Sequence, residues 1–157
     1  MKKADIIDYK KFYNRVKQTY PLVTSDLDPD PPVTDPKRLP EILDHFCTVT
    51  GFTSHQVADN KEKSLLLFIG VVAKLYSPNI HRFDERYPYS LSMRISKILQ
   101  VKKARILYYD RICRSYLQIY PEFSKAVDDI YQAIVDSLQK KSLVQLPGLM
   151  NKGICIK

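Results

Sequence analysis

The chain has 157 residues and a formal net charge of +8, which predicts one domain with a real core and room for an arm. Only four glycines and few stretches of alternating Thr and Val argue against a β-sandwich or barrel and favour an all-α multi-helix bundle. The start lacks the apolar segment of a signal peptide, and the longest apolar run, Leu65 to Tyr76, is too short to span a bilayer. We therefore expect a cytoplasmic protein with no membrane partner.

The N-terminal part, residues 1–39, is predicted to be a helix followed by a proline-rich arm. Over residues 4–20, apolar side chains recur every three or four positions, which is the period of an amphipathic helix. This helix either packs on the domain beside it or acts as a docking or dimerisation helix. Residues 20–40 hold six of the ten prolines, which favours an extended connector because proline blocks helix formation.

The main domain is predicted over residues 40–141. Its first helix starts at Pro40, a residue tolerated in the first turn, and ends at Gly51, a common C-cap. A short helix capped by Thr53 follows. The apolar run after it predicts a central buried helix, in which Gly70 would allow another helix to approach closely.

Residues 90–120 have the pattern of a helix-turn-helix. Ser90 or Ser92 can cap the first helix, and the chain breaks at residues 100–101. A second helix starting at Lys102 would place these apolar residues on one face: Ile106, Tyr109, Cys113, Tyr116, Leu117 and Tyr120.

The positive charge is concentrated on this motif. Residues 91–157 carry twelve Lys or Arg and five Asp or Glu, hence +7, and residues 94–114 hold seven cations and one acid, Asp110. A basic footprint on one motif indicates a nucleic-acid partner more strongly than an evenly spread charge does.

The end of the chain is predicted to be one further helix and an irregular tail. After Pro121, apolar residues recur in steps of three and four as far as Leu138, which is a core-facing stripe. Residues 142–157 form the tail, to which we assign no structure.

The cysteines and histidines have no metal-ligand spacing. There is no CxxC pair, and Cys47 and Cys113 fall on apolar faces, which is typical of buried thiols in a reducing compartment. We expect no metal site and no cofactor.

The order of these parts from about Pro40 to Leu138 resembles the C-terminal DNA-binding domain of the bacterial replication initiator DnaA, a Trp-repressor-like helix-turn-helix. The matching stretches are ILDHFCTVTGFTSHQVADNKEK, LLLFIGVVAKLY, ISKIL and ILYYDRICRSYLQIYPEFSKAVDDIYQAI. The resemblance implies a stand-alone protein that binds double-stranded DNA at the nucleoid, in replication initiation or its regulation. It also admits another replication or regulatory protein as a partner and leaves the oligomeric state open.

The chain departs from this family at the residues that read bases. The family's signature at the start of the recognition helix is of the type R-D-H-[ST]-T-V, whereas this chain has VKKARI at positions 101–106. Only the apolar Ile106 agrees, so the family's target sequence does not carry over. The family's ATPase module is missing, because no phosphate-binding G-x-x-x-x-G-K-[ST] motif occurs.

The candidate DNA-binding residues follow from the charge pattern and from the resemblance. The start of the second helix would enter the major groove, where cations can read guanine and apolar groups can touch thymine methyls. The outer positions and the lysines before the central helix would hold phosphates. The predicted set is Lys102, Lys103, Ala104, Arg105 and Tyr108 in the groove, with Arg94, Lys97, Arg111, Arg114, Lys61 and Lys63 on phosphates.

The sequence also bears on two other functions. A helix-turn-helix whose signature has changed can serve as a protein-protein interaction module that no longer binds DNA, and the eleven tyrosines suit an interface. An enzyme is disfavoured, because carboxylates are scattered and no histidine lies near a plausible nucleophile in the sequence.

Overall fold

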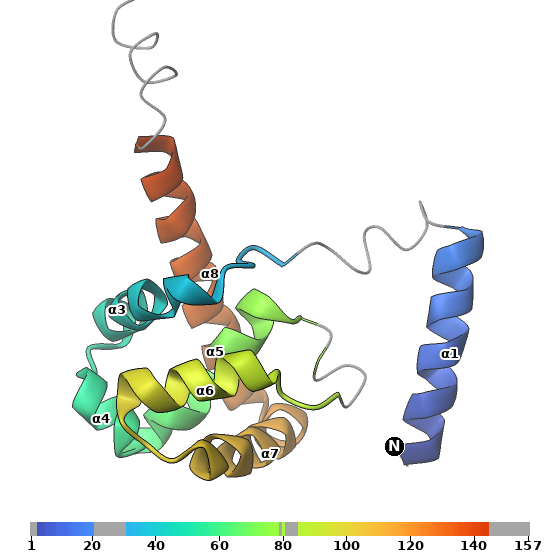
Figure 1. Cartoon of the computed structure of the whole chain (residues 1–157), viewed down its shortest axis with the longest axis horizontal. Helices are drawn as coiled ribbons and strands as arrows, with labels where there is room; N and C mark the ends of the chain where they lie inside the picture. Colours follow the sequence, from blue (N-terminus) through green and yellow to red (C-terminus); the bar gives the residue numbers. More distant parts are fainter. Residues whose placement is uncertain (1–2, 21–30, 79, 81–84, 145–157) are drawn as a thin grey trace, which may run out of the picture.

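The computed structural model describes residues 3–20, 31–78, 80 and 85–144, and every regular element within them is a helix. The predicted all-α multi-helix bundle is thereby confirmed (Figure 1). In the described part of the chain, no helix combines the length and the apolar content that a membrane crossing needs. The elements are α1 (Lys3–Thr19), η1 (Pro36–Arg38), α3 (Leu39–Thr50), α4 (Ser54–Ala58), η2 (Lys61–Lys63), α5 (Ser64–Tyr76), α6 (Tyr89–Leu99), α7 (Lys103–Ile119) and α8 (Pro121–Val144).

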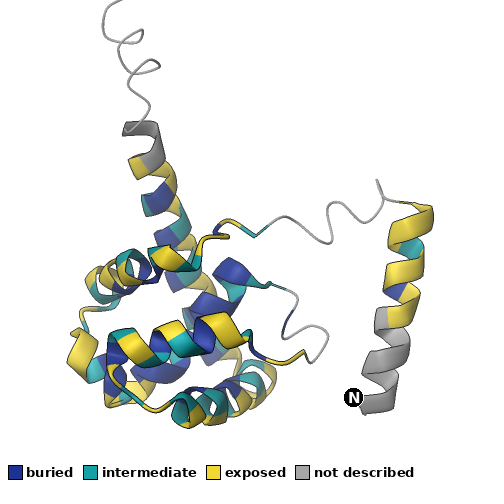
Figure 2. Ribbon diagram, viewed as in Figure 1, coloured by how far each residue is buried: buried dark blue, intermediate teal, exposed yellow. Residues whose placement is uncertain are grey.

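Helix α5 is the centre of the bundle. Its sequence is apolar on nearly all sides, and most of its residues are buried because α4, α7 and α8 pack around it (Figure 2). Gly70 provides the close approach that the sequence predicted. A Cβ atom at this position would lie 3.0 Å from Sγ of Cys113 on α7 and 3.4 Å from a methyl group of Val127 on α8.

The helix boundaries before α5 agree with the predicted turn chemistry. Helix α3 ends at Gly51, which has φ +80° and donates its N–H to the carbonyl of Cys47. Helix α4 starts with a reciprocal capping box. The Thr53 hydroxyl accepts from the N–H of Gln56 at 3.2 Å, and the Gln56 side chain accepts from the N–H of Thr53 at 3.0 Å.

Helices α6 and α7 form the predicted helix-turn-helix. The break at residues 100–101 is confirmed, because Gln100 takes a left-handed conformation with φ +56° after the last residue of α6. The predicted serine cap was wrong. Pro88 directs the chain into α6 before Ser90, so both serines lie inside the helix, and the Ser92 hydroxyl donates to the carbonyl of Tyr89.

Helix α8 closes the core with the predicted stripe. Its residues at steps of three and four are all buried and pack against α3, α5 and α7. The helix extends to Val144, so the predicted tail over 142–157 begins inside α8, and residues 145–157 lie outside the described part. The stripe consists of Phe123, Val127, Ile130, Ile134 and Leu138.

The end of the proline-rich arm is part of the packed domain. Val33 is buried in the core, and its N–H donates to the carbonyl of Leu75 at the end of α5. The hydroxyl of Tyr76 donates to the carbonyl of Asp35 at 2.9 Å. The packed unit therefore starts before the predicted boundary at Pro40. Helix α1 lies to one side of the bundle (Figure 1); its Tyr13 is buried, but it does not belong to the main core cluster.

Candidate nucleic-acid interface

The start of α7 has the two-sided character that the sequence predicted. Ile106 and Cys113 are fully buried against the core, whereas Lys102, Ala104 and Tyr108 are exposed. Lys102 is the N-cap residue of α7, and its extended backbone places it at the tip of the helix. Tyr108, with 57% of its surface exposed, adds a large aromatic side chain to this exposed face.

Lys103 is held at the junction of the two helices by an aromatic ring. Its ammonium nitrogen lies 3.9 Å from the ring centroid of Tyr89, the first residue of α6. Such a cation–π contact restricts where the ammonium can lie. Sequence reasoning missed Tyr89, because no helical spacing connects residues on opposite sides of a turn.

Arg105 also lies along an aromatic surface. Its guanidinium carbon is 5.5 Å from the ring centroid of Tyr109, whose ring makes an edge contact with Tyr108 at 5.4 Å between centroids. Tyr109 was predicted to be a core residue and is only partly buried. The first two turns of α7 thus combine cations with a tyrosine pair, a composition that suits contact with phosphates and bases.

Arg114 does not belong to the exposed surface on which it was predicted to hold a phosphate. Its Nε donates to Oδ2 of Asp110 at 3.0 Å, and a terminal nitrogen donates to the carbonyl of Glu85. The side chains of Arg114 and Asp110 are only 15% and 6% exposed. This pair fixes the segment before α6 against α7, so we give Arg114 a structural role. Asp110 was missed as a structural residue, although the i, i+4 spacing to Arg114 is a signal for such a pair.

A groove lies over this ion pair, between α7 and the segment that enters α6. Arg86 and Arg111 are exposed at its rim, and Tyr87 and Leu107 line it. Burial raises the pKa of Tyr87 well above its ordinary value, and its hydroxyl donates to the carbonyl of Ile69 at 3.3 Å. Arg111 has no carboxylate partner among the described residues and keeps its predicted role as a candidate phosphate contact.

Arg94 and Lys97 lie on the outer face of α6. Both side chains are exposed, and no carboxylate in the described ranges forms an ion pair with either of them. They are one turn apart on the helix, which gives α6 a basic edge on the side that faces η1.

The lysines before α5 are displayed by an unusual turn. Asn60, Glu62 and Lys63 all have positive φ, between 51° and 64°, a conformation that side chains other than glycine adopt at a cost. The Asn60 side chain accepts from the N–H groups of Leu65 and Leu66 at 3.0 and 3.3 Å, so it stabilises the turn at the start of α5. The strained turn is thereby held in one conformation.

This turn brings Lys63 to α7. Lys61 and Lys63 are exposed, and the ammonium of Lys63 lies 5.2 Å from the ring centroid of Tyr116 on α7. The structure therefore places Lys63 beside the C-terminal half of α7, whereas Lys102 and Lys103 lie at its N-terminal end.

The described residues contain no cluster of three or more His, Cys, Asp or Glu side chains arranged to hold a metal ion. Burial raises the pKa of the Cys113 thiol to about 12, so this thiol is protonated at neutral pH and packs as an apolar group.

No family model, curated protein or solved structure matches this chain. The resemblance to the C-terminal domain of DnaA therefore stays a prediction, and a functional proposal rests on the geometry of α6, α7 and η2.

Proposed function

We propose that this protein binds double-stranded DNA through the helix-turn-helix of α6 and α7, with the first turns of α7 in the major groove. One observation supports this proposal above the others. Helix α7 is seated on α5 by buried residues, while Lys102, Ala104 and Tyr108 face solvent at its start. A helix anchored in this way presents its N-terminal side chains to a partner without disturbing the core.

The side chains at the start of α7 suit base edges as well as phosphates. A lysine or arginine can donate to O6 and N7 of guanine, and the Ala104 methyl group can contact the methyl group of thymine. Lys103 and Arg105 each rest against a tyrosine ring, which limits the conformations that they must lose when they bind. We assign sequence reading to these residues and to Tyr108.

The surrounding cations would hold the phosphate backbone. Arg94 and Lys97 on α6, Arg111 on α7 and the two lysines of η2 are exposed. Each phosphate that a cation neutralises releases counterions, so the affinity should fall steeply as salt is added. A role in replication initiation or its regulation, and a location at the nucleoid, belong to this proposal and rest on the resemblance of residues 40–138 alone.

The decisive experiment compares Lys102→Ala with Lys140→Ala in the full chain. Both lysines are exposed, but Lys140 belongs to the last turns of α8, and the C-terminal end of α8 extends away from α6 and α7 (Figure 1). We expect a gel shift with random duplex DNA at low salt, several-fold weaker binding for Lys102→Ala and no change for Lys140→Ala. Selection of bound duplexes from a random pool would then give the preferred site.

Two results would count against the proposal. If the wild-type chain does not shift duplex DNA even at low salt, the scaffold serves protein contacts instead. If the wild-type chain binds but Lys102→Ala and Lys140→Ala behave alike, α7 is not the contact. Circular dichroism of each variant shows whether the bundle is intact.

A further inference from the structure

A second basic groove lies between the end of the proline-rich arm and α6. Three cations from two distant parts of the sequence line it: Lys37 of η1, with Arg94 and Lys97 of α6. Pro40 and Ile98 supply apolar walls. Arg94 and Lys97 were predicted from the sequence to be phosphate contacts. The arm was predicted to be only a connector, so Lys37 had no predicted role.

The charge in this groove is not neutralised by the protein. No carboxylate lines it, and none of the described carboxylates forms an ion pair with any of the three cations. Asp35 is the acidic residue closest to Lys37 in the sequence, and its side chain accepts a hydrogen bond from the backbone N–H of Lys37 at 2.9 Å. Three like charges facing one groove repel each other, so an anion placed between them would relieve that repulsion.

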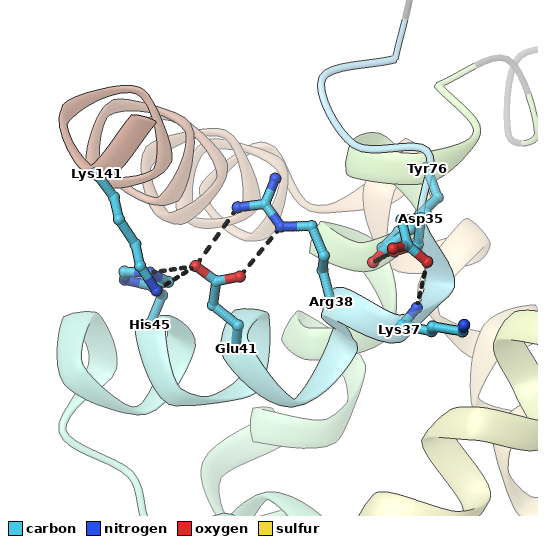
Figure 3. A network of polar contacts seen from close by, with 7 residues as sticks. All are labelled: Asp35, Lys37, Arg38, Glu41, His45, Tyr76 and Lys141. Carbon is cyan, nitrogen blue, oxygen red and sulfur yellow. Dashed lines mark hydrogen bonds and ion pairs between the residues drawn. The ribbon is translucent and has the colours of Figure 1, made fainter. Parts of the chain in front are cut away.

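Lys37 is held in position by the residues on either side of it. The neighbouring Arg38 turns to the opposite side, where its Nε lies 3.1 Å from Oε2 of Glu41. Lys141 of α8 donates to the other oxygen of that carboxylate at 2.9 Å. Figure 3 shows this network and shows Lys37 pointing away from it. With the Tyr76–Asp35 hydrogen bond, these contacts fix η1 on the domain, so the Lys37 ammonium is presented from a rigid base.

We propose that this groove binds a backbone phosphate of the DNA duplex, so that Lys37 and the end of the arm are part of the DNA-binding surface. This inference rests on the proposed function. Its occupant follows from the chemistry of the groove. Exposed cations, with no buried polar group to select a small ligand, suit a polyanion, and apolar walls suit the sugars that separate phosphates. The arm would thus add a contact beside those of α6.

The test is the salt dependence of duplex binding by the full chain with Lys37→Ala, Lys37→Arg and the control Lys140→Ala. Each lost phosphate contact lowers the slope of log affinity against log salt by about 0.9, so Lys37→Ala should bind roughly eightfold more weakly at 0.1 M salt. The loss should be the same for every duplex sequence, because phosphates carry no sequence information. Lys37→Arg keeps the charge and should keep the wild-type slope.

The outcomes separate this inference from the proposed function. If the wild-type chain binds, Lys102→Ala weakens it, and Lys37→Ala matches Lys140→Ala in affinity and slope, then the groove proposal is wrong and the proposed function stands. If the wild-type chain does not bind duplex DNA, both are wrong. If Lys37→Ala weakens some sequences and not others, Lys37 reads bases and the phosphate assignment is wrong. Thermal melting of each variant checks that η1 is still docked.

Discussion

Glu41 joins η1, α3 and α8, and the stabilisation that it provides depends on pH. Replacing Glu41 by glutamine should remove most of this pH dependence. Hydrogen bonds from Arg38 and then from Lys141 lower the pKa of the Glu41 carboxyl from 4.5 to about 2, against the opposing effect of burial. His45 lies beside the same carboxylate, with its Nε2 at 3.9 Å (Figure 3). Because the folded-state pKa is depressed, this stabilisation is fully present above pH 4.5 and is lost as the pH falls towards 2.

The size of the effect follows from the pKa difference and from the exposure of the pair. A carboxyl whose pKa falls from 4.5 to about 2 on folding contributes at most about 3 kcal/mol at neutral pH. The side chains of Glu41, Arg38 and Lys141 are 24%, 35% and 49% exposed, so solvent screens them. We therefore expect about 1–2 kcal/mol, which is a change of about 3–6 °C in melting temperature.

The assay is urea unfolding of the wild-type chain and of Glu41→Gln at several pH values between 2 and 7. The difference in unfolding free energy between the two proteins should be largest above pH 5 and should shrink as the pH approaches 2. Asp129→Asn is the matched control, since Asp129 pairs with Lys125 as an exposed i, i+4 pair and should change stability by less than about 0.5 kcal/mol. A constant difference between wild type and Glu41→Gln across this range would refute the reasoning.

Three further changes test the contacts of α7 and the cap of α4. Asp110→Ala should cost about 3 kcal/mol in urea unfolding, because it leaves the Arg114 guanidinium, only 15% exposed, without its carboxylate; a cost below about 1 kcal/mol would show that the pair is dispensable. Gly70→Ala places a methyl group 3.0 Å from the Cys113 sulfur and should lower the free energy of unfolding. This loss should be about 1 kcal/mol smaller in a Cys113→Ala background. Additive effects of the two substitutions in the double-mutant cycle would contradict the contact. Thr53→Ala removes a capping-box hydroxyl and should cost about 1 kcal/mol, whereas Thr53→Ser should be nearly neutral; equal losses would exclude the cap.

Features encoded by neighbouring residues could be predicted from the sequence. The stop of α3 at Gly51, the cap at Thr53 and the break after α6 each depend on residues close together in the chain, and all three are found in the structure. The stripe of α8 was also predictable, because one face of a helix repeats every three or four residues.

Contacts between distant residues could not be predicted in this way. Lys141 reaches Glu41 across 100 positions, and the docking of Val33 on Leu75 depends on how the helices pack. The same limit applies to the site. Lys102 and Tyr108 were placed correctly on the exposed side of α7, but the burial of Arg114 depends on Glu85, which lies on a separate segment. The predicted serine caps were wrong because Pro88 is the N-cap residue of α6, so the helix starts before both Ser90 and Ser92.

The way α7 sits on α5 separates two kinds of position along a single helix. Ile106 and Cys113 are fully buried in the core, whereas Lys102, Ala104 and Tyr108 are exposed to solvent. Substitutions at the second group should therefore leave the architecture intact, and under the proposed function each would change the DNA-binding surface alone. If the domain binds DNA as proposed, its preferred sequence can change over evolution without any change in its core.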